Sequence, residues 1–136
     1  MSDMTATTRR IIAIEAHRRR TGHCPTLIHA LGTGETFEVE PFADGFLDRG
    51  SGQRVEATPD GRLLSAGRAL AELRLTGDLG FEGFDVGASE RFTGSAGGGA
   101  SVTLHGADPK DYSQYAVVGF NGEYLTEPQI ALVKAQ

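Results

Sequence analysis

The chain has 136 residues, enough for one domain with a buried core, and its nineteen glycines and absent tryptophan indicate short strands joined by tight turns. Its formal charge of −5 is unevenly divided, because residues 1–23 carry five arginines against Asp3 and Glu15 while the remainder is strongly acidic. A single cysteine excludes an internal disulfide, no apolar run approaches the length of a membrane span, and no secretory signal is recognisable. We therefore expect a protein made in the cytoplasm.

The first predicted element is a helix that ends near Arg20. Threonines between residues 5 and 8 can cap its start, and Thr21-Gly22 can end it. Ile12 and Ala16 lie on one face, and arginines cover much of the rest. Because the apolar stripe is narrow and a helix of about 15 residues is marginal alone, we expect this basic helix to dock on something.

Period-two alternation and turn residues then predict a series of short strands. The expected strands are 26–31, 36–40, 55–58, 63–65, 69–76, 81–86, 90–93, 101–105 and 115–120. The clearest is 69–76, where apolar residues at odd positions alternate with Glu72, Arg74 and Thr76. A helix over 62–75 is the alternative, since several apolar residues there also fit a helical stripe, but Gly67 in the middle favours strand.

Other segments of the chain are predicted to be irregular. Residues 43–52, which include Phe46 and Leu47, are expected to form a polar glycine-rich loop, and residues 94–100 a flexible connection. Within 81–86 the inward parity is predicted to change at Gly83 through a β-bulge. A capping-box spacing near Thr126 predicts a short helix at the C-terminus.

The elements predict a mostly β fold: a small antiparallel β-barrel or a two-sheet sandwich with an N-terminal helix and a short C-terminal helix. One domain spans 1–136, with a basic helix or arm at 1–22, a β domain at 23–125 and a helix or tail at 126–136.

No motif in the sequence specifies a reaction. The glycines at 94–99 lead into a strand and not a helix, so they do not resemble a phosphate loop. The spacing of His23, Cys24 and His29 gives no local metal-ligand set, so we predict no metal and no cofactor. The arginines lack interleaved aromatic residues and the body is acidic, which argues against nucleic acid as the partner. Acidic residues at 78–90 are explained by solubility as well as by acid–base chemistry on sugars.

The sequence therefore favours a non-enzymatic interaction or assembly module, for example an accessory structural subunit of a phage-like particle or shell. Its expected partner is a protein or further copies of itself, with no membrane involved. The predicted partner-binding residues lie in the basic helix and in loop 43–52. They are Arg9, Arg10, Arg18, Arg19, Arg20, Phe46 and Leu47.

The alternative is a small β-barrel that binds a small molecule or acts as an enzyme. Its cavity would lie between the sheets, lined by Phe37, Phe81, Phe84, Phe92, Tyr115 and Phe120. A Cys24–His105 pair is the first catalytic candidate, because a histidine can activate a thiol. A structural role for Cys24 as a small apolar side chain before proline is the competing interpretation.

Overall fold

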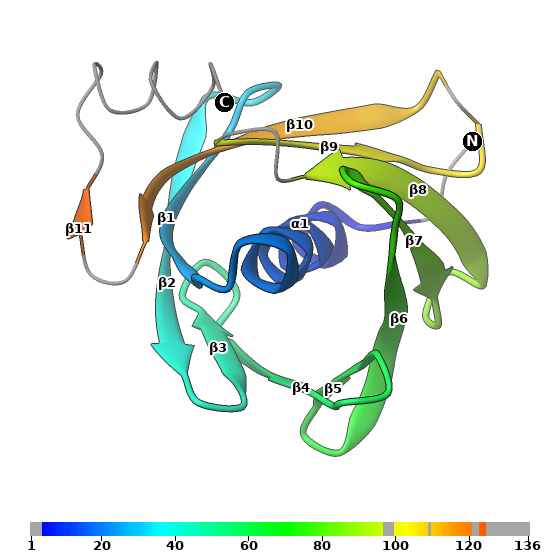
Figure 1. Ribbon diagram of the computed structural model, residues 1–136, viewed down its shortest axis with the longest axis horizontal. Coiled ribbons are helices and arrows are strands. Elements are labelled where there is room, and N and C mark those ends of the chain that lie inside the picture. The colour runs from blue at the N-terminus through cyan, green and yellow to red at the C-terminus, as the bar shows by residue number, and fades with distance from the viewer. Residues whose placement is uncertain (1–3, 97–99, 109, 121–122, 125–136) are drawn as a thin grey trace.

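The protein is a closed antiparallel β-barrel of ten strands with its N-terminal helix inside (Figure 1). The computed structural model describes residues 4–96, 100–108, 110–120 and 123–124. The strands are β1 (Pro25–Ala30), β2 (Glu35–Phe42), β3 (Gly45–Asp48), β4 (Gln53–Ala57), β5 (Arg62–Ser65), β6 (Arg68–Thr76), β7 (Gly80–Asp85), β8 (Glu90–Ala96), β9 (Ser101–His105) and β10 (Tyr112–Phe120), followed by the short β11 (Glu123–Tyr124). Each strand pairs with the next, and β1 also pairs with β10, which closes the barrel. The prediction of a barrel is confirmed, and the sandwich alternative is excluded.

The helix α1 (Ala6–Thr21) begins and ends as the sequence predicts. Thr5 is the N-cap, and its hydroxyl accepts a hydrogen bond from the amide of Thr8. Gly22 ends the helix with a φ of 78°, a conformation that glycine adopts without a steric penalty. From there only Gly22, His23 and Cys24 connect the helix to β1.

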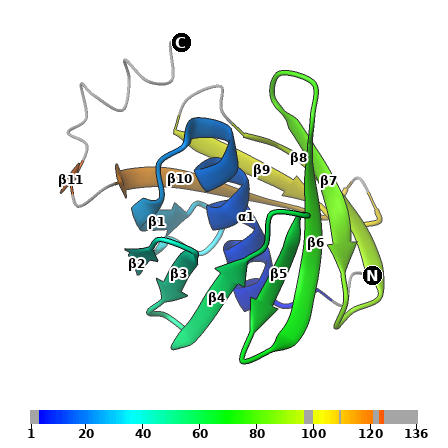
Figure 2. The same ribbon diagram turned by 60° about the horizontal axis from the view of Figure 1, so that its bottom comes forward.

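The position of α1 differs from the expectation of an external arm, because the helix fills the lumen of the barrel (Figures 1 and 2). Residues 9–17 are all buried, and Ile12, Ala13 and Ile14 have no exposed surface. A barrel of eight strands is just filled by its own side chains, so ten strands leave space that something else must occupy. The helix supplies that material and is the centre of the hydrophobic core.

The predictions for three segments of the wall are wrong. Residues 45–48 of the expected loop form β3, and the side chain of Phe46 is fully buried in the core. The register between β6 and β7 is regular through Gly83, so there is no bulge and the inward parity continues to Asp85. Phe84 consequently lies on the outer face. The helical alternative for 62–75 is also excluded, because this segment forms β5 and β6. Residues 94–96 of the expected connection form the end of β8. The expected C-terminal helix at 126–136 and residues 97–99 lie outside the described residues.

Candidate functional site

The buried arginines of α1 are held by carboxylates of the barrel wall. Arg10 forms a two-pronged ion pair with Asp48, with Nε 3.0 Å from Oδ1 and Nη2 2.7 Å from Oδ2. Its guanidinium also stacks on the ring of Phe37 at 3.8 Å from the centroid. Arg9 Nη2 lies 2.7 Å from Asp111 Oδ2, and Arg9 Nη1 donates to Ser113 Oγ. These contacts fix the N-terminal half of the helix to the barrel.

The three arginines at the other end of α1 bind backbone carbonyls of the wall. Arg18 Nη2 donates to the carbonyl of Ala43, and Arg19 Nη1 donates to that of Leu73. Arg20 donates to carbonyls in the β6–β7 turn, the shortest contact being 2.6 Å to Gly80. Arg18 and Arg19 also bind the carboxylate of Glu15, which is completely buried.

The residues expected to bind a partner therefore contact their own barrel. Arg9 and Arg10 are 8% and 5% exposed, and Phe46 is fully buried, so nearly all of the surface of these side chains is covered by their own fold. The expectation that α1 docks outside its own fold is corrected for a physical reason: Arg9 and Arg10 are paired with the carboxylates of Asp111 and Asp48 in their own barrel.

The proposed Cys24–His105 pair is not assembled. Cys24 precedes Pro25, which is aligned with Phe120 of β10, whereas His105 is aligned with Tyr112 at the opposite end of β10. At about 3.3 Å per residue the two side chains are separated by roughly 25 Å along the barrel. Burial also raises the pKa of the Cys24 thiol to about 12, which keeps it protonated at neutral pH.

Within the described part of the chain, α1 occupies the lumen where the large ligand cavity was predicted. Phe81 and Phe92 pack edge to face within the core, with ring centroids 6.3 Å apart. Of the aromatic residues expected to line this cavity, Phe37 and Tyr115 line a pocket at the end of the barrel near the start of α1, and Phe84 and Phe92 line a hollow on the outer face.

This end pocket has a volume of about 410 Å³, within the range of known ligand sites. It lies between the first turns of α1, the β1–β2 turn, β2 and the beginning of β10. Its lining residues are Ala6, Arg9, Arg10, Ala30, Leu31, Gly32, Thr33, Glu35, Phe37, Tyr112, Ser113, Gln114 and Tyr115. Leu31 is 50% exposed and Tyr112 is 56% exposed, so both present apolar surface beside the opening.

The polar lining of the end pocket is held by neighbouring groups. Burial raises the pKa of Tyr115 above its ordinary value, and the neighbouring Ser113 side chain partly opposes this rise. Ser113 in turn accepts from Arg9, so one chain of contacts links the wall to the helix. Because these side chains are fixed before anything binds, the pocket is preorganised.

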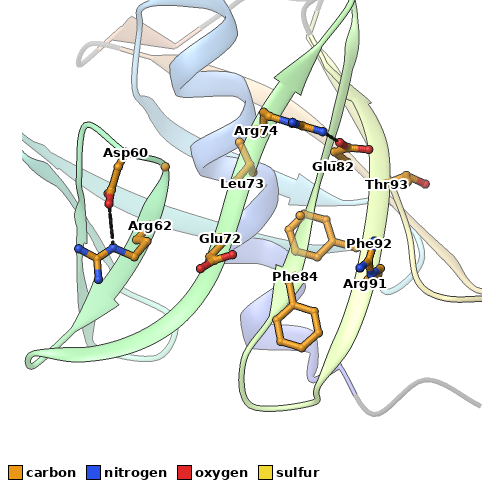
Figure 3. Close-up of a pocket in the computed structure, with 12 residues that line it drawn as sticks. Asp60, Arg62, Glu72, Leu73, Arg74, Glu82, Phe84, Arg91, Phe92 and Thr93 are labelled. Atoms are coloured by element: carbon orange, nitrogen blue, oxygen red, sulfur yellow. Dashed lines mark hydrogen bonds and ion pairs between the residues drawn. The ribbon is translucent and has the colours of Figure 1, made fainter.

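A larger hollow of about 670 Å³ lies on the outer face of the barrel over β5 to β8 (Figure 3). Its charged side chains pair largely with one another, as in Asp60 with Arg62 and Arg74 with Glu82. These pairs are 41–77% exposed, so each contributes little and the groove resembles an ordinary solvated sheet face. We therefore take the end pocket as the candidate site.

A third hollow, of about 330 Å³, is lined by residues that include Arg91 and His105. The described residues contain no cluster of three or more His, Cys, Asp or Glu side chains placed to hold a metal ion. In the same part of the chain, no helix combines the length and the hydropathy needed to cross a bilayer.

Sequence reasoning missed the end pocket, although it named Arg9, Arg10, Phe37 and Tyr115 separately. Comparison with known proteins adds no assignment, since no protein-family model, no curated protein and no solved structure matches the chain.

Proposed function

We propose that the protein is a non-enzymatic interaction module that holds a group of a partner protein in the end pocket. The observation that carries the proposal is the rim of this pocket. Four large hydrophobic side chains are exposed among the described residues, and two of them, Leu31 and Tyr112, line it. Exposed apolar surface beside a concave site is typical of interaction surfaces.

The rigidity of the barrel supports the proposal. The ion pair of Arg10 with Asp48 and the contacts of Arg9 fix the floor of the pocket to both the helix and the wall. When a partner group enters the pocket, the partner loses conformational entropy, but the rigid protein loses little. An accessory subunit of a shell or particle would attach through this end and not through its basic helix.

The small-molecule alternative applies to the same pocket, since a volume of about 410 Å³ would also hold a free ligand. The apolar rim outside the cavity favours a protein partner, because a small ligand inside the pocket would leave Leu31 and Tyr112 partly uncovered.

The test is a screen of capped dipeptides by amide chemical-shift mapping on the full-length protein. We expect apolar dipeptides to shift the resonances of Leu31, Tyr112 and Ser113, and Leu31→Asn to weaken this binding. Leu79→Asn is the matched control, because Leu79 is 49% exposed but lies in the β6–β7 turn, at the other end of the barrel. The proposal fails if no dipeptide shifts the pocket resonances, or if the two variants behave alike. A library of free small molecules that binds where dipeptides do not would replace the protein partner with a ligand.

A further inference from the structure

The floor of the end pocket contains an Arg10 N–H group that has no acceptor among the described residues. Arg10 has five N–H groups, and its contacts with Asp48 use one on Nε and one on Nη2. Its side chain is 6% exposed, yet Nη1 donates to no group in the described part of the chain. Nη1 is not fully enclosed by other atoms. Because Arg10 lines the end pocket, Nη1 is accessible from there. The pocket therefore presents a donor to whatever enters it.

The charges around this donor favour an uncharged acceptor over an acidic one. Asp48 and Asp111 already neutralise Arg10 and Arg9. Glu35 lines the same pocket and forms no ion pair within the described residues, which leaves the site with one excess negative charge. A carboxylate on the partner would be repelled by Glu35, whereas an uncharged carbonyl oxygen would not.

The remaining lining of the pocket is suited to an apolar side chain. One face of the Phe37 ring is covered by the Arg10 guanidinium, and Ala30 and Tyr115 lie beside each other in the register of β1 and β10. Leu31 and Tyr112 extend this surface to the outside of the barrel. An apolar side chain in the cavity and a neighbouring peptide carbonyl on Arg10 would together satisfy the site.

Building on the proposed function, we infer that the end pocket selects an uncharged peptide segment. An apolar side chain of the segment fills the cavity, and its backbone carbonyl accepts a hydrogen bond from Arg10 Nη1. Arg10 is thus the specificity-determining residue, in addition to its structural pairing with Asp48.

Three probes test the inference by NMR titration of the full-length protein. They are the neutral N-acetyl-phenylalanine N-methylamide, the acidic N-acetyl-phenylalanine, and propylbenzene, which has no carbonyl. We expect the neutral amide to bind roughly two- to fivefold more tightly than the acid, as for one exposed like-charge contact. We expect propylbenzene to bind roughly tenfold more weakly than the amide, as for one hydrogen bond. The amide should also shift the Nε–Hε resonance of Arg10.

The variant Glu35→Gln separates charge selection from folding, because Glu35 is exposed and forms no ion pair in the described chain. It should bring the acid to the affinity of the amide and leave the amide unchanged. If the probes bind but the acid equals the amide in both proteins, or the Arg10 resonance does not move, the inference is overturned while the proposed function stands. If none of the probes shifts the pocket resonances, the proposed function fails as well.

Discussion

Removal of residues 1–22 should unfold the barrel, because it removes α1, which fills the lumen. Ile11, Ile12 and Ile14 are at most 1% exposed, and burial of each such side chain contributes about 1.5–3 kcal/mol. Without Arg10, the carboxylate of Asp48 would lose its ion pair and keep only Ser51 as a hydrogen-bond partner among the described residues, which costs roughly 3–5 kcal/mol. The combined loss of about 8–14 kcal/mol is as large as the whole stability of a typical domain, about 5–15 kcal/mol.

Circular dichroism and amide NMR of residues 23–136 provide the assay. We expect the truncated chain to lose its β-sheet circular dichroism and the dispersion of its amide resonances. Addition of a synthetic peptide of residues 1–22 should restore the dispersed resonances. Removal of residues 1–3 alone is the control and should leave the fold intact, since Met4 and the Thr5 cap remain. A truncated chain that unfolds cooperatively at the temperature of the full-length protein would refute the role of the helix as the core. The external-arm interpretation of the sequence predicts that opposite result.

Three further predictions follow from single side chains. Burial lowers the pKa of His17 from 6.5 to about 4. Between these pH values His17 is protonated in the unfolded chain but neutral in the folded protein. Stability should therefore fall by about 3 kcal/mol as the pH drops through this window, and His17→Leu but not His29→Gln should flatten the denaturation-midpoint profile. Burial raises the pKa of Cys24 to about 12, so a disulfide reagent at pH 8 should label the denatured protein at once but the folded protein only as fast as the fold opens locally. Immediate labelling of the folded protein would contradict the burial of Cys24. Gly83→Ala should cost roughly 1–3 kcal/mol in urea denaturation, because a Cβ would collide with the Glu72 carbonyl and the Phe92 ring, whereas Gly87→Ala, with no neighbour closer than 3.6 Å, should be tolerated.

The strands were predictable from the sequence because the side chains of a barrel wall alternate between core and solvent. Ala71 and Leu73 are buried and Glu72 and Arg74 are exposed, as the pattern in 69–76 predicts. The prediction was wrong at Gly83, since Phe84 was taken as an inward residue. In the structure the inward positions are the small Gly83, over which Phe92 packs, and the acidic Asp85. Hydrophobicity alone misleads where a core position is occupied by glycine or by a carboxylate.

The interior position of α1 was not predictable from its amphipathicity. A helix buried on every side is usually apolar on every side, but this one carries Arg9, Arg10 and Glu15 into the core. Their burial depends on partners such as Asp48 and Asp111, which lie 38 and 102 residues away from the arginines that bind them. Sequence spacing does not reveal such pairs. The signal that was available is the run Ile11-Ile12-Ala13-Ile14, which places apolar groups on all sides of the helix and not on one stripe.

The end pocket was missed for the same reason. It forms only where the first turns of α1 meet β10, and these segments are about one hundred residues apart in the chain. Phe37 and Tyr115 were correctly expected to line a cavity, but the site was expected between two sheets, where the helix now lies.

The enclosure of α1 constrains the order in which the polypeptide can reach this state. The helix is synthesised first, and β10, which completes the ring by pairing with β1, is synthesised near the end of the described chain. A finished cylinder has no lateral opening, and the linker of three residues is too short for the helix to be threaded in afterwards. The wall must therefore wrap around the helix. During synthesis, the apolar residues near Ile12 remain uncovered until more than one hundred further residues have been added. Such long-range closure favours slow folding and makes the nascent chain dependent on protection from aggregation.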